Sequence, residues 1–130
     1  AELLANAELT DRTRLLAIHE ARERGISEAE PALLALLEHD NDALVIAAGA
    51  ALSHLGANNA APQLVAATER MSRARQHEEM VQLIYTLGRL DDPGARIYLE
   101  TLEQAHGEPR VRDAARESLE RAKKLSGRQP

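Results

Sequence analysis

A chain of 130 residues is long enough to bury one hydrophobic core and too short for two independent ones. The sequence contains no Cys, which excludes disulfides, thiolate nucleophiles and Cys-based zinc sites, and no Phe or Trp, so any core is largely aliphatic. Its net charge is -5, and its common residues Ala, Leu, Glu, Arg and Gln all favour helix. We therefore expect an all-α protein.

Helix starts are marked by three prolines at a regular interval. In chain order, Pro31, Pro62 and Pro93 are 31 residues apart, and each opens an apolar helical segment. Proline fits the first turn of a helix, because the N–H that it lacks would have no intrahelical partner there. A fixed interval of this length is typical of a repeated pair of helices.

Helix ends are marked by glycines at nearly the same interval. Gly25, Gly56 and Gly88 are 31 and 32 residues apart, and glycine tolerates the left-handed conformation that closes a helix. Alternatively, Gly88 lies within the last helical turn, which then continues to Leu90. Each repeat therefore has a first helix that begins at the proline, a short turn, and a second helix that ends near the glycine.

These markers divide a single domain, residues 1–130, into repeated units. The first unit is partial, with a short helix expected at 2–8 and a second helix at 11–24 that Thr10 or Asp11 caps. Asp42 and Pro109 stand at two later second-helix starts, since Asp caps helices and Pro is tolerated in the first turn. The second helices of the later units are expected at 42–55, 77–90 and 109–124. The units span 1–30, 31–61, 62–92 and 93–124, and 125–130 form a tail.

Each second helix carries an apolar stripe at helical spacing, so each hairpin has a face that it cannot bury alone. Stacking the hairpins buries these faces against one another and produces a continuous core along the array. The last helix is charged everywhere except on its stripe, as the end of such an array must be to stay soluble. The stripe residues are Ala48, Leu52 and Leu55; Met80, Ile84 and Leu87; and Val111, Ala115, Leu119 and Ala122.

Two segments resemble HEAT repeats of the short bacterial kind, related to those named after phycobilisome lyases. They are PALLALLEHDNDALVIAAGAALSHLG at 31–56 and LGRLDDPGARIYLETLEQAHGEPRVRDAARESL at 87–119, and the resemblance covers residues 31–124. It implies an α-α superhelix, a right-handed solenoid of about four HEAT/ARM-like hairpins, with the second helices along the concave side. Such repeats serve in scaffolds, transport, regulation and a few enzymes.

The polar ladder of this family is incomplete in the sequence. The repeats often carry Asp in the turn and Arg near the start of the second helix, and Glu108 and Arg112 approximate that pair in the last unit. Ile46 replaces the Arg in the second unit, and the third unit has His77 and two glutamates instead. We therefore expect packing between units to depend on aliphatic contact more than on a polar ladder.

The non-core positions of the second helices are the expected contact surface. We expect the chain to be a non-catalytic scaffold or adaptor that binds a peptide or protein there. Tyr85 is the large amphipathic residue of this surface and a favoured hot-spot type, with a core position as the alternative. Gln82, Tyr85, Thr86 and Arg89 form the expected centre, and Ser53 and His54 extend it. Alignment on the closing glycines gives three rows: His19, Ala50, Gln82 and Ala114; Arg22, Ser53, Tyr85 and Glu117; Glu23, His54, Thr86 and Ser118.

The alternative function is an accessory or catalytic unit of a lyase-like or metal-dependent HEAT-repeat enzyme. Deoxyhypusine hydroxylase has this fold and holds two irons with His-Glu pairs at several second-helix starts, but here His77-Glu78 is the single pair in such a place. Ser53 and His54 are helical neighbours that point about 100° apart, so they do not form an activated nucleophile. We expect no enzymatic activity, no cofactor and no metal site.

The charge pattern bears on possible partners. No Lys or Arg occurs between Arg24 and Arg70, and this acidic stretch opposes phosphate, so we expect no nucleic-acid binding. The C-terminal helix is basic, which predicts weak head-to-tail self-association or, alternatively, simply solvated helix faces. No apolar run approaches the roughly 18 residues of a membrane span, so we expect a soluble chain. The absence of Cys leaves its compartment open, and we favour the cytoplasm. A removed N-terminal leader is the alternative, because the sequence opens with Ala1.

Overall fold

The computed structural model describes residues 10–127, with side chains described through Lys124. Within this range every regular element is helical, which confirms the all-α prediction. The short helix expected at 2–8 lies outside the described residues. The elements are α2 (Asp11–Arg24), η1 (Ser27–Ala29), α3 (Glu30–Leu36), α4 (Asp42–His54), η2 (Asn58–Ala60), α5 (Ala61–Arg73), α6 (His77–Leu87), α7 (Pro93–Ala105) and α8 (Pro109–Gly127), where η denotes a short 3₁₀ helix.

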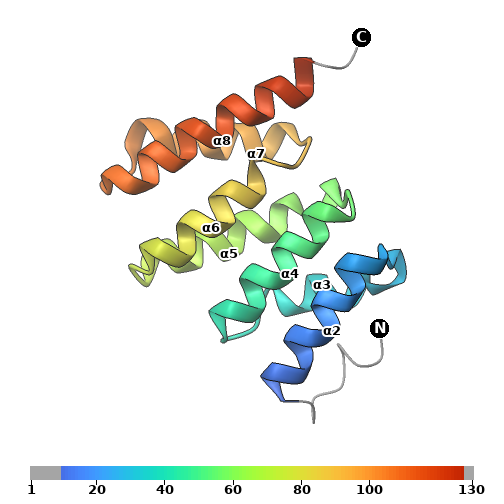
Figure 1. Cartoon of the computed structure of the whole chain (residues 1–130). Helices are drawn as coiled ribbons and strands as arrows, with labels where there is room; N and C mark the ends of the chain where they lie inside the picture. The colour runs from blue at the N-terminus through green and yellow to red at the C-terminus, as the bar shows by residue number, and fades with distance from the viewer. Residues whose placement is uncertain (1–9, 128–130) are drawn as a thin grey trace.

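The helices form two layers (Figure 1). In the first, which we call the second-helix layer, α2, α4, α6 and α8 follow one another in order, and each packs against the next. In the other layer, α3, α5 and α7 each pack against the helix that follows them in the chain, and α5 also packs against α7. The exposed surface of the second-helix layer is therefore built from segments about one repeat apart in the sequence.

The helix starts show which polar residues act as caps. The Oγ1 of Thr10 accepts a hydrogen bond from the N–H of Thr13 at 3.2 Å, so Thr10 is the cap of α2. At α4 the cap is Asn41, whose Oδ1 accepts from the N–H of Ala43 at 2.9 Å. The prediction that Asp42 caps this helix is wrong, because Asp42 is already its first helical residue. The three regularly spaced prolines lie in the first turns of α3, α5 and α7, as predicted.

The three marker glycines have two different roles. Gly25 and Gly56 have φ angles of 62° and 75°, in the left-handed region that the sequence predicts for them. Gly88 has φ -67° and lies in a turn that continues through Leu90, which confirms the alternative place. A Cβ on Gly88 would lie 2.7 Å from the Cβ of Ser118, so this glycine is needed where α6 approaches α8 closely.

The core follows the predicted stripes. Of the ten stripe residues, nine are buried, and Leu55 alone of them is half-buried. Further apolar side chains, including Leu33, Leu44 and Leu64, complete one continuous cluster that runs from α2 to α8. The aliphatic contact expected between units is therefore present along the whole described stack.

Polar contacts also join the first two units. The Nδ2 of Asn41, before α4, donates to Oδ2 of Asp11 at the start of α2 at 2.8 Å, and this hydrogen bond is the main cause that lowers the pKa of Asp11. His39 Nε2 lies 3.8 Å from the other oxygen of Asp11 and 3.5 Å from Nη1 of Arg14. At this boundary, local hydrogen bonds supplement the aliphatic core in place of a regular Asp-Arg ladder.

Candidate partner-binding groove

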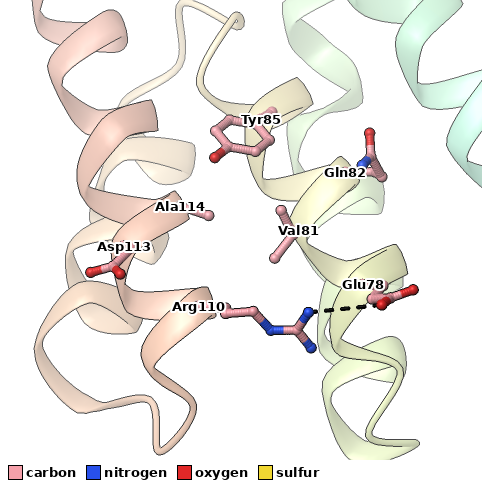
Figure 2. A pocket seen from close by; sticks show the side chains of 7 residues that line it. All are labelled: Glu78, Val81, Gln82, Tyr85, Arg110, Asp113 and Ala114. Atoms are coloured by element: carbon pink, nitrogen blue, oxygen red, sulfur yellow. Dashed lines mark ion pairs between the residues drawn. The ribbon is translucent and has the colours of Figure 1, made fainter.

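A groove opens between α6 and α8 on the second-helix layer (Figure 2). Its volume is about 430 Å³, at the lower end of the roughly 300 to 1,000 Å³ of typical ligand sites. Val81 and Ala114 project into it from opposite helices, and Tyr85 forms one end. The groove is lined by Glu78, Val81, Gln82, Tyr85, Arg110, Asp113 and Ala114.

Helical spacing explains which side chains reach the groove. On α6 the lining residues recur at intervals of three and four, from Glu78 through Val81 and Gln82 to Tyr85, so they share one face of the helix. The opposite side of α6 is buried in the core. On α8, Arg110 and Ala114 follow the same rule. The lining faces of α6 and α8 are therefore turned toward each other, and the branched Val81 and the small Ala114 form the floor of the groove.

Tyr85 is fixed across the boundary between the two helices. Its hydroxyl donates a hydrogen bond to Oε2 of Glu117 on α8 at 2.9 Å. This bond raises the pKa of Tyr85, and partial burial and the negative charge of Glu117 raise it further. The phenol thus stays protonated at neutral pH and holds the end wall of the groove in place.

Charged side chains form the rim at the other end. Nη1 of Arg110 lies 3.8 Å from Oε1 of Glu78, the ion pair drawn in Figure 2, and its Nε lies 3.8 Å from Oε1 of Glu108. On the α8 side, Asp113 pairs with Arg116. The cations near the floor are thus already engaged with carboxylates, and exposed pairs of this kind contribute about 0 to 1 kcal/mol each.

The six residues expected on the contact surface fall into three groups. Gln82 and Tyr85 line the groove. Ser53 is half-buried and His54 and Arg89 are exposed, and none of these three lines it. Thr86 is different, because only 5% of its surface is exposed. Its side chain packs toward α4, where Cγ2 would lie 3.8 Å from a Cβ placed on Gly49, and its hydroxyl donates to the carbonyl of Gln82 at 3.2 Å. Thr86 therefore belongs to the core rather than to the surface.

The predicted rows correctly pair residues of α6 and α8. Tyr85 and Glu117 share a row and are hydrogen-bonded, and Gln82 and Ala114 share a row and line the same groove. In the third row, Thr86 and Ser118 are buried, with 5% and 2% of their surfaces exposed, whereas Glu23 and His54 are exposed. The predicted rows did not include four further lining residues, although helical spacing carries the signal for them. Glu78 and Arg110 lie four residues before Gln82 and Ala114, and Val81 and Asp113 lie four residues before Tyr85 and Glu117.

A pair of histidines near the turns invites a metal hypothesis, which the contacts do not support. The rings of His77 and His106 meet edge to face with centroids 5.6 Å apart, and His77 Nδ1 lies 3.9 Å from Glu108 Oε2. Both ring nitrogens of His106 are engaged, one by the N–H of Glu108 at 3.0 Å and the other by Oγ of Ser72 at 3.0 Å. No group of three or more potential ligands among the described residues could hold a metal ion.

Comparisons of the chain with protein-family models, with curated proteins and with solved structures found no match. Among the helices of residues 10–127, none combines the length and the apolar character that crossing a membrane requires.

Proposed function

We propose that the chain is a right-handed solenoid of about four HEAT-like hairpins that acts as a non-catalytic scaffold and binds a peptide or protein segment on its second-helix layer. The arrangement of helices supports the solenoid, because α2, α4, α6 and α8 pack in series and the other layer follows the same order. A series of this kind leaves one side of each second helix without a packing partner among residues 10–127.

The observation that carries the binding proposal is the groove between α6 and α8. It combines an apolar floor of Val81 and Ala114 with Tyr85, a residue type that is enriched at binding hot spots. It is open along one side and small, so it suits one or two side chains of a longer segment better than a whole small molecule. The hydrogen bond from Tyr85 to Glu117 fixes the wall before a partner arrives, which reduces the entropy that binding must overcome.

The test is a selection of binders from a library of random 12-residue peptides displayed on phage, with the whole chain as the target. Selected peptides are then synthesised, and their dissociation constants are measured by fluorescence anisotropy. Tyr85→Ala should weaken binding by about tenfold or more, as expected for a central aromatic contact. Arg89→Ala should have a smaller effect, because Arg89 does not line the groove.

Ile97→Ala is the matched control. Ile97 is a large apolar residue on α7 that is 64% exposed and lies outside the groove, so its removal should leave the affinity unchanged. Circular dichroism of each variant verifies that it is folded. The proposed function is refuted if no peptide is enriched, or if the enriched peptides bind the Tyr85→Ala variant as tightly as the wild type.

A further inference from the structure

The geometry points to the chemistry of the partner side chain. We propose that the Tyr85–Glu117 end of the groove binds a Lys or Arg side chain of the partner segment, with the aliphatic stem of that side chain on Val81 and Ala114. This inference rests on the proposed function, because it concerns the same groove. It adds a selectivity for cationic segments that the shape of the groove alone does not provide.

The first step of the argument is the hydrogen-bonding character of this end. Tyr85 has one hydroxyl hydrogen, and it is donated to Glu117 Oε2. The oxygen of Tyr85 therefore offers lone pairs, and the second oxygen of Glu117 is an additional acceptor. An ammonium or guanidinium group is a donor without acceptor capacity, so it complements this arrangement.

The second step is whether a nearby cation neutralises the carboxylate of Glu117. Glu117 forms no ion pair with any side chain that the structure describes. Two of the nearby arginines are engaged elsewhere: Arg110 lies between Glu78 and Glu108, and Arg116 pairs with Asp113. The charge of Arg121 lowers the pKa of Tyr85, but its effect there is smaller than the effect of the charge of Glu117. The carboxylate is thus the dominant charge at this end of the groove.

The third step concerns the side chains that fit poorly. A partner carboxylate would face Glu117 and Asp113, and like charges at short range repel. A purely apolar side chain would cover Glu117 without providing a donor, and removing a charge from water without a partner is costly. A Lys or Arg side chain avoids both costs, because its methylene groups cover the apolar floor while its charged head stays at the polar end.

The experiment uses the peptides selected from the random library on the whole chain. Lys and Arg should be enriched in them, and replacing the shared basic position of a selected peptide by Gln should weaken its binding. Glu117→Gln should weaken binding of the basic peptide by about two- to fivefold, the range expected when an exposed charge pair is lost. The amide oxygen of the substituted side chain would still accept the hydrogen bond from Tyr85, so the wall of the groove is preserved. Raising the salt concentration should reduce the difference between the two proteins.

Glu69→Gln is the matched control. Glu69 accepts a hydrogen bond from the hydroxyl of Tyr98 at 2.6 Å in the other helix layer, so the substitution changes the same chemistry away from the groove. It should leave the affinity for the basic peptide unchanged. If the selected peptides depend on Tyr85 but are not enriched in Lys or Arg, or if Glu117→Gln binds them like the wild type, the cationic inference is overturned while the proposed function stands. An empty selection overturns both.

Discussion

The close approach of α6 to α8 at Gly88 leads to a quantitative prediction for Gly88→Ala. A Cβ at this position would lie 2.7 Å from Cβ, 2.9 Å from the carbonyl oxygen and 3.0 Å from Cα of Ser118. Two of these three atoms belong to the backbone of α8, so rotation of a side chain cannot relieve the contact. The end of α6 must move away from α8, and the groove that the two helices line must widen.

The expected change in the free energy of unfolding of Gly88→Ala is the sum of two opposing effects. Overpacking of a well-packed contact costs about 1 to 3 kcal/mol. Gly88 has a right-handed conformation that Ala adopts without strain, so the lower entropy of the unfolded chain returns about 0.4 to 1 kcal/mol. The middle of each range gives a fall in the free energy of unfolding of about 1.3 kcal/mol.

Urea unfolding followed by circular dichroism provides the assay. With a slope of about 1.5 kcal/mol per molar urea, a loss of about 1.3 kcal/mol lowers the midpoint by about 0.9 M. Gly107→Ala is the matched control, because a Cβ there would meet nothing within 4 Å, and its stability should change by less than about 0.5 kcal/mol. If Gly88→Ala is as stable as the wild type, the two helices do not approach each other as the structure has them.

Three further predictions concern single side chains. Arg75 is exposed and has φ 58°, a left-handed conformation that costs a non-glycine residue about 1 kcal/mol, so Arg75→Gly should raise the free energy of unfolding in urea by about that amount. Tyr98→Phe removes the hydrogen bond to Glu69 and should lower the free energy of unfolding by about 1 kcal/mol; an unchanged urea midpoint would show that this bond contributes nothing. Burial lowers the pKa of His106, and the charge of His77 adds to this effect, so the folded chain binds a proton less readily than the unfolded chain. The stabilisation is complete above the unfolded pKa of about 6.5 and is lost as the pH falls from there through the folded pKa. His106→Asn keeps an acceptor for the N–H of Glu108 without titrating, so its loss of stability between pH 7.5 and pH 5 should be smaller than that of the wild type, and equal losses would contradict this assignment.

The helical architecture was predictable because its signals are local. A proline in the first turn, a glycine after the last turn and an apolar stripe at helical spacing each act within one helix, and they recur at one interval. The role of Gly88 was not predictable in the same way. The sequence shows a glycine at the expected end of a helix, but whether it is required by its own φ or by the neighbouring backbone depends on where Ser118 lies.

The sequence predicts which residues of neighbouring second helices lie side by side better than it predicts which side chains face the surface. Alignment of the repeats placed Tyr85 opposite Glu117, because equivalent positions of neighbouring second helices lie side by side when the hairpins pack in series. Thr86 lies outside the predicted stripe of α6 and therefore falls in the expected contact surface, yet it lies three residues after the buried Leu83 and four before the buried Leu90, on the core side of the helix. Its hydroxyl bonds within its own helix, which permits its burial.

The two tyrosines connect the groove to the stability of the molecule. Tyr85 bonds across α6 and α8, and Tyr98 bonds from α7 back to α5, so each layer has one phenol-carboxylate bond between the last two units. A partner that binds the groove contacts the side chain that makes the first of these bonds, and it therefore binds the packed arrangement of α6 and α8 rather than a separated one. Binding to the folded state alone adds RT ln(1 + [L]/Kd) to stability, about 2.7 kcal/mol at a hundredfold excess over Kd. Because Gly88→Ala widens this same boundary, it should weaken peptide binding as well as folding, whereas Arg75→Gly, outside the lining of the groove, should change stability alone.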